Sequence, residues 1–557
     1  MRPAILLLGS NERAALAVCR SLGRMGARIE ILRFSWDKTP ADFSKYSARS
    51  HYIGEPYANV RRYSEALLRL VERRRYDYLF PINDVANELA YFNYDSLGAL
   101  ATLIGPTPED YRKASNKHAA LQIGQQAGIR SPESVYLAGD DSSVPALGFP
   151  LYAKPVQSAL IRDNYLHTFS VRKVTSPAQL ESKLRDDLPR VPVLLQQEIS
   201  GHGVGLNFCA FKGTLCGVSV TIRVHEPVDG GGSSYRQTGE LTPELFEVAK
   251  AIARHLEWTG MMMVELKSDG RDLYMMELNC RPWGSIELSI QSGVDYPRLV
   301  LDSMVRHAPT DAVVLPVRQM FVRNLKSDVG WIWRRRRTWL TKESDLPGWL
   351  WSFHRVVLGR EKFDLEQPAD ALPAFSQLSA SLSQLGKRGA RLLRRVAPRS
   401  NGTPARPHVS PSWKLLFVCR GNINRSVVAQ HYLSAQGFRS VCSAGIIGQQ
   451  GRKPSAQAEA YLRSRGIDAS EHRSRDVRTL ERELMEADLV IVFDRRNMAE
   501  LAELYPALTG RVRLLSSIAS GGNESIGDPH DRTDAEYARC FDRIVKHLDR
   551  VIADGRS

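Results

Sequence analysis

Residues 398–412 read PRSNGTPARPHVSPS, and this run of proline, serine and arginine limits how the chain can fold more than any other feature. Such a composition cannot bury enough apolar surface to form a core, so it predicts a linker. An apolar strand, WKLLFV, starts directly afterwards at Trp413. The chain has 557 residues, which is more than a single hydrophobic core normally serves. We therefore expect at least two separately folded parts, with the clearest boundary at this linker.

The composition is that of an ordinary globular protein, with 43% hydrophobic and 25% charged residues. The sequence has no apolar run near the roughly 18 residues that a membrane-spanning helix needs. A glycine and charged residues follow its short apolar start at once, so that start reads as a buried strand and not as a signal peptide. The seven cysteines are scattered and lack metal-site spacing, which favours reduced thiols. Together these features predict a cytoplasmic protein.

Strand and helix patterns alternate at the start of the chain. ILLLGS (5–10), a helical stretch at 12–25 and ARIEILRF (27–34) predict a strand, a helix and a strand, and YDYLFPIND (76–84) predicts a further strand. This order is typical of a doubly wound parallel sheet. Beyond residue 106 a helix is predicted over 241–256, and strands are predicted over 149–156, 191–199, 204–211, 260–268 and 272–279.

The segment LLFVCRGNINRSVVAQHYLSAQG (415–437) carries the clearest chemical signal. A short apolar strand runs into Cys419, and Arg425 follows six positions later at the start of an amphipathic helix. A loop between a strand end and a helix N-terminus can turn its N–H groups toward a phosphate. The same positive field favours a thiolate, and the arginine fork can grip two phosphate oxygens. Gly421 would let the loop turn tightly, and Asn422 would brace it by hydrogen bonding.

Hydrolysis of a phosphate ester also needs an acid that protonates the leaving oxygen. Asp528, in SIGDPHDRTDAEY, is the candidate, because an Asp-Pro step in a surface loop holds a carboxylate in place. With the thiolate and the arginine, this carboxylate predicts a phosphatase that uses a cysteine nucleophile.

Residues 413–557 closely resemble the low-molecular-weight protein tyrosine phosphatases. The similarity covers nearly the whole domain, and it is carried by CRGNINRS, the late Asp-Pro and the segments SAGI at 443–446, GIDASEHRSR at 466–475 and ADLVIVFD at 487–494. The resemblance implies a four-stranded parallel sheet flanked by helices, a phosphocysteine intermediate, a phosphotyrosine protein as substrate and no cofactor.

The resemblance also implies a role for each matching residue. Cys419 would be the nucleophile, Arg425 would bind phosphate and stabilise the transition state, and Asp528 would act first as acid and then as base. The rest of the phosphate loop would be Arg420, Gly421, Asn422, Ile423, Asn424 and Ser426, with Ser443 as support. Two positions depart from the family pattern: Asn424 stands where many relatives have a second cysteine, and His530 where many have an aromatic residue.

A second set of polar residues lies in the first 310 residues. Glu277 and Asn279 are two apart on a predicted strand, so both face the same side, and Glu265 lies on the strand before. Their oxygens suit Mg²⁺, while Lys117 and Lys154 suit nucleotide phosphates. The sequence therefore predicts a site for ATP and Mg²⁺.

This arrangement resembles the ATP-grasp carboxylate–amine ligases, which have a Rossmann-like domain before the ATP-grasp domain. The similarity is carried by those residues and by the segments 225–239 and 277–297. It implies that a small-molecule carboxylate is phosphorylated and that an amine then attacks the acyl phosphate. By position, the ATP-binding residues would be Lys117, Lys154, Gln196, Gln197, Glu198 and Ile199; the metal ligands Glu265, Glu277 and Asn279; and the substrate and acyl-phosphate ligands Arg223, Arg236 and Arg281.

Two departures from this family leave an alternative open. The segment VQSALIRDNYL (156–166) contains no glycine where the family usually has a glycine-rich flap, and GHGVG (201–205) lacks the acidic residue that often holds ribose. The first part would then either catalyse ligation or only bind ATP, as a regulatory or localising module for the phosphatase.

Basic charge is concentrated between the two parts. Residues 311–412 hold 18 Lys and Arg against 8 Asp and Glu, a net +10 of the total +15. Five of the nine tryptophans fall within 331–351, and 385–398 has an apolar stripe with a basic face. Both segments could contact an anionic membrane surface; alternatively, the tryptophans pack on the ligase part beside a solvated linker. The charge comes with no recognised nucleic-acid-binding module, so nucleic acid is not expected as a partner.

The sequence thus predicts an α/β protein in four parts. Residues 1–105 form a Rossmann-like pre-ATP-grasp domain and 106–310 an ATP-grasp domain of the α+β type. Residues 311–412 form a basic extension and linker, and 413–557 a phosphatase domain with a four-stranded parallel sheet. The predicted function is a bifunctional enzyme, a tyrosine phosphatase joined to an ATP-dependent ligase.

Overall fold

The structure of the chain is a computed structural model. It describes residues 2–10, 13–35, 37–57, 59–139, 148–188, 190–226, 232–334, 345–379, 409–447, 450–505, 508, 511–522, 524–529 and 534–555. These residues form two compact units. The first comprises Met1–Pro56 and Val60–Leu392, and the second comprises Tyr57–Asn59 and Leu393–Ser557.

The first unit begins with a parallel five-stranded sheet in the order β3-β2-β1-β4-β5. Its middle strand β1 reads AILLL, a continuous apolar run that is typical of a parallel sheet covered by helices on both faces. The doubly wound sheet predicted for this part is therefore confirmed. The strands are β1 (Ala4–Leu8), β2 (Arg28–Arg33), β3 (Ser47–Tyr52), β4 (Tyr78–Pro81) and β5 (Thr102–Leu103). The helices are α1 (Arg13–Arg24), η1 (Pro40–Phe43), α2 (Val60–Arg74), α3 (Asp84–Phe92), α4 (Tyr94–Gly98), α5 (Pro108–Ser115) and α6 (Lys117–Gln126).

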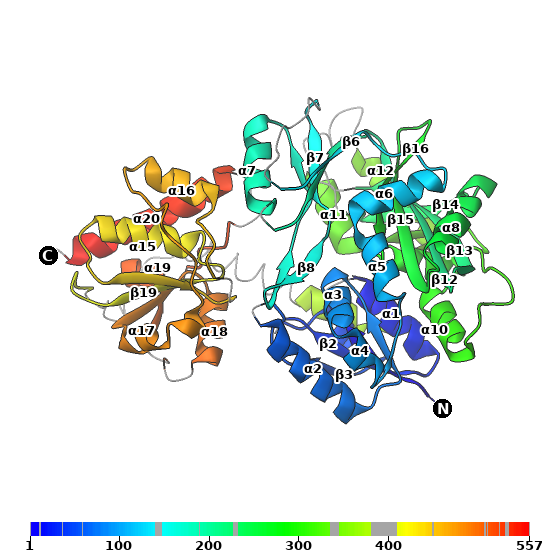
Figure 1. Cartoon of the computed structure of the whole chain (residues 1–557), viewed down its shortest axis with the longest axis horizontal. Coiled ribbons are helices and arrows are strands. Elements are labelled where there is room, and N and C mark those ends of the chain that lie inside the picture. Colours follow the sequence, from blue (N-terminus) through cyan, green and yellow to red (C-terminus); the bar gives the residue numbers. More distant parts are fainter. Residues whose placement is uncertain are drawn as a thin grey trace. The chain divides into compact units, whose positions relative to one another are not determined.

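A four-stranded antiparallel sheet in the order β10-β7-β11-β6 and a separate hairpin, β8–β9, follow in the same unit (Figure 1). Alternating apolar side chains of β7 and β11 pack with α7 into a small core of their own. These elements are β6 (Ser134–Leu137), β7 (Leu151–Pro155), β8 (Ala159–Arg162), β9 (Tyr165–Thr168), β10 (Arg172–Val174), α7 (Pro177–Asp187) and β11 (Val193–Gln197).

The largest sheet of the first unit has seven strands in the order β16-β15-β12-β13-β14-β17-β18. Its members are β12 (His202–Phe211), β13 (Thr214–His225), β14 (Tyr235–Gly239), β15 (Gly260–Ser268), β16 (Leu273–Asn279), β17 (Phe321–Arg323) and β18 (Glu361–Phe363). The helices around it are α8 (Pro243–His255), α9 (Ile286–Ser292), α10 (Tyr296–Arg306), α11 (Leu325–Arg334), α12 (Asp345–Ser352) and α13 (His354–Val357). Thr242 caps α8, because its side chain accepts a hydrogen bond from the Leu245 N–H. The two sheets together confirm the ATP-grasp fold class.

The basic extension, which the sequence predicts as a separate part, joins this sheet. The last two strands, β17 and β18, come from it and pair in parallel with each other. Buried ion pairs hold them in place, because the guanidinium of Arg323 bonds Glu361 and Asp328 and lies over the ring of Tyr235. A buried arginine needs such partners, since an unpaired charge away from water is strongly destabilising.

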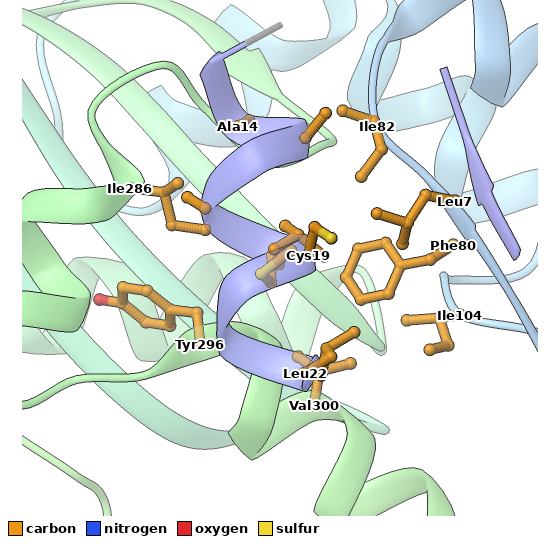
Figure 2. Close-up of a cluster of buried hydrophobic side chains, with 14 of the residues drawn as sticks. Leu7, Ala14, Cys19, Leu22, Phe80, Ile82, Ile104, Ile286, Tyr296 and Val300 are labelled. Carbon is orange, nitrogen blue, oxygen red and sulfur yellow. The ribbon is translucent and has the colours of Figure 1, made fainter. Parts of the chain in front are cut away.

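Helix α1 joins the first sheet to the seven-stranded sheet through one hydrophobic core. Figure 2 shows Leu7 and Phe80 of the first sheet on one side of α1, and Ile286 and Tyr296 on the other. Cys19 lies on the helix within this core and is fully buried. The two sheets therefore belong to one packed body. Polar residues on the two sheets are consequently held in fixed positions relative to one another.

Two tryptophans of the extension pack on the ATP-grasp sheet. Trp331 stacks on His225 of β13 with ring centroids 3.7 Å apart. The indole N–H of Trp349 donates to the buried carboxylate of Asp328 at 2.6 Å. The membrane contact predicted for 331–351 is therefore not supported. These two tryptophans instead pack on the ATP-grasp sheet, which was the alternative interpretation of this segment.

The second membrane candidate, 385–398, lies outside the residues that the structure describes, as does most of the linker 398–412. Among the described residues, no helix is both long enough and apolar enough to span a bilayer.

The second unit contains a parallel four-stranded sheet in the order β20-β19-β21-β22, and this confirms the fold predicted for the phosphatase part. Its elements are β19 (Leu415–Cys419), α15 (Arg425–Ala435), β20 (Val441–Gly445), α16 (Ala456–Arg463), η3 (Val477–Thr479), α17 (Glu481–Glu486), β21 (Leu489–Val492), α18 (Arg495–Leu504), β22 (Val512–Leu514), α19 (Leu515–Ser520) and α20 (Asp534–Gly555). Side chains of β19 alternate between two separate apolar cores, one on each face of the sheet. The carboxyl end of β19 opens into the loop that carries the predicted chemistry.

Candidate functional site

The thiol of Cys419 lies at the carboxyl end of β19, immediately before the loop that leads to α15. It is 2% exposed, and two donors face its sulfur. The hydroxyl of Ser426 lies 3.0 Å from Sγ, and the N–H of Asn422 donates to it at 3.3 Å. These two groups orient hydrogen-bond donors toward the atom that the sequence predicts to be the nucleophile.

Asn422 organises the loop through its side-chain amide. Its Nδ2 donates to the hydroxyls of Ser426 at 2.9 Å and Ser443 at 2.7 Å, and its Oδ1 accepts from the N–H of Arg475 at 2.9 Å. The Ser443 hydroxyl in turn donates a hydrogen bond to Gln430 Oε1 at 2.6 Å. Because Ser426 accepts from Asn422, its hydrogen remains available for the Cys419 sulfur. The predicted support by Asn422, Ser426 and Ser443 thus has a definite hydrogen-bond direction.

The tight turn of the loop comes from other residues than the sequence predicts. Asn422, and not Gly421, has the left-handed backbone conformation, with φ +52°. Asn tolerates this region because its short polar side chain bonds locally. The glycine that the loop requires is Gly445 on β20: a Cβ there would meet the backbone of Gly421 and Arg420 at 3.0–3.1 Å. The close approach of β20 to the loop therefore excludes a side chain at this position.

Arg425 lies between two carboxylates. Its Nη1 bonds Asp494 at 2.5 Å and the Ile526 carbonyl at 2.8 Å, and its Nη2 bonds Asp528 at 2.9 Å. Burial opposes its charge, but Asp528, Cys419 and Asp494 outweigh that effect and raise the pKa of Arg425. The guanidinium therefore stays charged and is held by these three partners. The structure brings Arg425 and Asp528 together, as the sequence predicts.

His472 supports the loop from the segment 466–475. Its Nε2 lies 3.2 Å from the Asn422 carbonyl, which can only accept, so Nε2 carries the hydrogen. Its Nδ1 lies 3.3 Å from Nε2 of His431. Burial lowers the pKa of His472 to about 4, so the ring is neutral at neutral pH. Sequence reasoning assigned this histidine no role, although it lies inside a segment that resembles the family.

The remaining predicted loop residues surround this network. Ile423 and Asn424 are buried, while Arg420 is half-buried. Asp494 was missed as an Arg425 partner, although it ends the strand-like segment ADLVIVFD. His530 lies outside the described residues.

The sheet separates Cys419 from Cys442. Cys419 packs in the core that contains Phe417, whereas Cys442 packs in the core on the opposite face. Cys540 of α20 shares the core of Cys419, but its sulfur points to the carbonyl of Gly527 at 3.5 Å. Both cysteines lie outside the phosphate loop. Within the loop, Asn424 stands where many relatives have a second cysteine.

Oxidation of Cys419 by peroxide is expected to be poorly reversed by a thiol reductant. Without a resolving cysteine in the loop, the sulfenic acid passes on to sulfinic and sulfonic acids, which a thiol does not reduce. The measurement is the phosphatase activity recovered by dithiothreitol after graded peroxide treatment. Full recovery would contradict the prediction, and loss of that recovery in Cys540→Ser, with Cys442→Ser as the matched control, would identify the protecting sulfur.

In the first unit, Glu265, Glu277 and Asn279 face one side of the antiparallel pair β15–β16. Glu265 lies directly opposite Glu277, and Asn279 lies opposite Met263. The Asn279 amide donates to Glu265 at 3.2 Å. Oxygen donors gathered in this way fit Mg²⁺. Among the described residues, no group of three or more His, Cys, Asp and Glu side chains could hold a metal ion. The candidate metal ligands at this site are therefore two carboxylates and an amide.

The two predicted lysines approach the same strands. Lys117 Nζ lies 3.5 Å from Glu277 and donates to the Ser158 hydroxyl at 2.9 Å. Lys154 Nζ donates to Gln196 at 2.5 Å, and burial lowers the pKa of Lys154. Removal from water opposes ionisation of Glu277, but the charges of Lys117, Lys154 and Arg281 lower its pKa.

The predicted adenine strand continues from this point. Gln196 is buried and Gln197 is exposed, so they face opposite sides of β11, while Ile199 follows the strand half-buried. Glu198 accepts from Lys173 at 2.7 Å. Only part of this segment therefore faces the lysines.

The three predicted substrate arginines are not gathered at one point. Arg223 bonds Glu265 at 2.8 Å, and Arg281 bonds Asp84 of α3 at 3.1 Å. Arg236 is fully buried and bonds Asp364 of the extension. Arg223 and Arg281 thus border the metal-binding set, while Arg236 is already neutralised by a carboxylate of the chain itself.

The second unit places a cysteine at a strand end, an arginine at the start of the next helix and an aspartate on that arginine, which is the arrangement that the sequence predicts for a phosphatase. Residues 414–554 match the family described as low molecular weight phosphotyrosine protein phosphatase. The chain is 33% identical over 137 residues to the probable low molecular weight protein-tyrosine-phosphatase EpsP of Ralstonia nicotianae, covering 24% of this chain and 90% of that protein. To Wzb of Salmonella typhimurium, also a protein of this kind, it is 27% identical over 138 residues, covering 25% and 87%. Through its second unit the chain belongs to the low molecular weight protein-tyrosine-phosphatase family.

The first unit has its own match. Residues 191–327 match the family described as ATP-grasp in the biosynthetic pathway with Ter operon. Among solved structures, an L-amino acid ligase from Bacillus licheniformis is 18% identical with a TM-score of 0.44, covering 58% of this chain and 79% of that one. The chain therefore joins a segment similar to an ATP-grasp family, residues 191–327, to a low molecular weight phosphatase part.

Proposed function

We propose that residues 413–557 hydrolyse phosphotyrosine in proteins through a phosphocysteine intermediate. The observation that carries the proposal is the position of the Cys419 sulfur: it faces two hydrogen-bond donors at a strand end, beside Arg425 and Asp528. The names of the relatives support the substrate class. Release of inorganic phosphate from a phosphotyrosine peptide by the purified chain tests it.

The reaction follows from these positions. The Cys419 sulfur attacks phosphorus, the bond between phosphorus and the tyrosine oxygen breaks, and Asp528 gives that oxygen a proton. Water then attacks the phosphocysteine while Asp528 takes its proton, and phosphate leaves the regenerated thiolate. Arg425 binds two phosphate oxygens and stabilises the charge that gathers on them in both steps. The N–H groups at the start of α15 serve the third oxygen.

For the first part we propose an ATP- and Mg²⁺-dependent carboxylate–amine ligase, with residues 1–105 and 106–310 as its two domains. When bound, Mg²⁺ would neutralise the phosphate charge. Glu265, Glu277 and Asn279 would hold it, and Lys117 and Lys154 would bind the nucleotide phosphates. A carboxylate would attack the terminal phosphorus of ATP beside Arg281 and ADP would leave, and an amine would then displace phosphate from the acyl phosphate. The face shared by β15 and β16 is the observation that carries this proposal.

Glu277→Gln is expected to weaken binding of MgATP by roughly 10-fold or more, because it removes one of two metal-facing charges. Isothermal calorimetry on the full chain measures the effect. Glu247→Gln is the matched control, since Glu247 lies on α8, where it pairs with Lys250 of the same helix. Equal affinity in Glu277→Gln and the wild type would count against the metal assignment, and no binding by the wild type would discard the ATP site.

In a second candidate function, the first part binds ATP without turnover and acts as a regulatory or localising module for the phosphatase. Asp364 favours it, because a carboxylate of the chain already occupies Arg236, the residue predicted to hold the acceptor. ADP release against a panel of amines and carboxylates separates the two. Turnover with any pair supports the ligase, and nucleotide binding without turnover supports the module. We place both activities in the cytoplasm.

A further inference from the structure

The hairpin β8–β9 stands where the ATP-grasp resemblance predicts a glycine-rich flap. Its two-residue turn is Asp163–Asn164, and both residues are left-handed, with φ +51° and +65°. Such a turn matches the natural twist of a hairpin. Aspartate and asparagine are the residues besides glycine that adopt it most readily. The hairpin therefore has a defined shape although it contains no glycine.

The tip of the hairpin is bonded to the beginning of α2, about a hundred residues earlier in the chain. The carbonyl of Asn164 accepts from the N–H of Val60 at 3.0 Å, and its side-chain Oδ1 accepts from the N–H of Arg61 at 2.8 Å. The first N–H groups of a helix have no acceptor within the helix. Asn164 satisfies two of them and thereby caps α2 from a distant segment.

The base of the hairpin reaches the predicted nucleotide site. Ser158, the residue before β8, accepts from Lys117 at 2.9 Å, and its carbonyl accepts from the N–H of Phe169 at 2.9 Å. Lys117 in turn lies 3.5 Å from Glu277. One end of the hairpin is thus fastened at the phosphate-binding lysine, and the other end at α2.

The hairpin also lies against a helix that serves the same site. β8 packs beside α3, which begins at Asp84, the partner of Arg281 (Figure 1). The core around α1 holds the first sheet and the seven-stranded sheet together (Figure 2). The tip contact consequently ties the hairpin to the body that also carries the metal-facing strands.

From these contacts we propose that Asn164 is a positioning residue of the nucleotide site, because it latches the β8–β9 hairpin to α2 over the phosphate-binding groups. This inference rests on the proposed ATP site. Nucleotide enters and leaves when Asn164 releases the N–H groups of α2, and the hairpin covers the phosphates when those bonds are made. A two-bond latch opens far more easily than the packed core around α1.

The test uses the full chain with Mg²⁺ and a fluorescent ATP analogue, chased with unlabelled ATP in a stopped-flow instrument. Asn164→Gly keeps the left-handed turn and removes the side-chain amide, including the Oδ1 that accepts from the Arg61 N–H. We expect the analogue to dissociate about 2- to 10-fold faster, the range set by loss of one hydrogen bond. The amide of Arg61 should exchange hydrogen faster by a similar factor. Asn164→Asp, which keeps an acceptor of the same shape, should restore the slow rate.

A control variant distinguishes loss of the latch from a general loss of stability around the sheet β10-β7-β11-β6. Ser176→Gly removes the cap of α7, where the Ser176 hydroxyl accepts from the Gln179 N–H at 3.4 Å, and should leave the dissociation rate unchanged. The latch is overturned if Asn164→Gly releases nucleotide at the wild-type rate, or if Ser176→Gly speeds release equally. If the wild type binds no analogue, the ATP site itself fails and the latch fails with it.

Discussion

Cys419→Ser is expected to abolish hydrolysis of an aryl phosphate, by roughly 10⁴-fold or more, while inorganic phosphate still binds. A serine hydroxyl at this position is a far weaker nucleophile than a thiolate, because a hydroxyl keeps its proton at neutral pH. The groups that would hold phosphate, Arg425 and the N–H groups before α15, are left in place. Steady-state hydrolysis and calorimetry with phosphate measure the two properties separately.

The matched control is Cys442→Ser, because Cys442 packs in the core on the opposite face of the sheet from Cys419. It should keep wild-type activity. Hydrolysis near the wild-type rate by Cys419→Ser would refute the covalent mechanism. Loss of both hydrolysis and phosphate binding would instead mean that the loop had collapsed.

The phosphate loop could be predicted because its chemistry is local. A strand end, a helix start and the residues between them lie within about ten positions, so Cys419 and Arg425 follow from short-range pattern alone. The partners of Arg425 do not follow from a short-range pattern. Asp494 and the Ile526 carbonyl come from other strands and loops, 69 and 101 positions away. Only the sheet order β20-β19-β21-β22 brings them to one edge.

The turn within the loop shows a different limit. Glycine is the default residue where a backbone turns tightly, and on that basis Gly421 was the expected turn residue. The left-handed residue is Asn422, whose side chain bonds Ser426 and Ser443 and so compensates for the strained conformation. The packing constraint falls on Gly445, which is adjacent to the loop in space but not in sequence.

The residues proposed to hold the metal in the first unit illustrate what strand periodicity can predict. Two residues two apart on one strand face the same side, so Glu277 and Asn279 were predictable as a pair. That Glu265 lies directly opposite Glu277 depends on the register of β15 and β16, which sequence alone does not fix.

Arg236 marks the limit of residue-by-residue transfer from a family. Its position suggested an acceptor ligand, yet the extension supplies Asp364, 128 positions later, as its partner. The extension appeared irregular in sequence because β17 and β18 have three residues each, too short for a recognisable alternation. Long-range contacts of short strands are therefore the part of this fold that pattern cannot supply.

Asp528→Asn is expected to slow hydrolysis of phenyl phosphate by roughly 10²-fold or more, because its leaving oxygen needs a proton. An ester with a strongly acidic phenol, such as dinitrophenyl phosphate, needs none and should react at nearly the wild-type rate. Asparagine keeps an oxygen for the Arg425 contact, which spans 2.9 Å in the wild type. The loop should therefore stay in place, so the variant removes only the proton.

Asp494→Asn is the matched comparison, since Asp494 also bonds Arg425, at 2.5 Å, but is not assigned the proton transfer. A change at Asp494 acts through the orientation of Arg425, which both esters need equally, so it should slow the two esters by the same factor. The difference between the two variants isolates the role of the acid: a leaving-group dependence in Asp528→Asn alone assigns the proton to Asp528. Equal slowing of both esters in Asp528→Asn would show that Asp528, like Asp494, only positions the arginine.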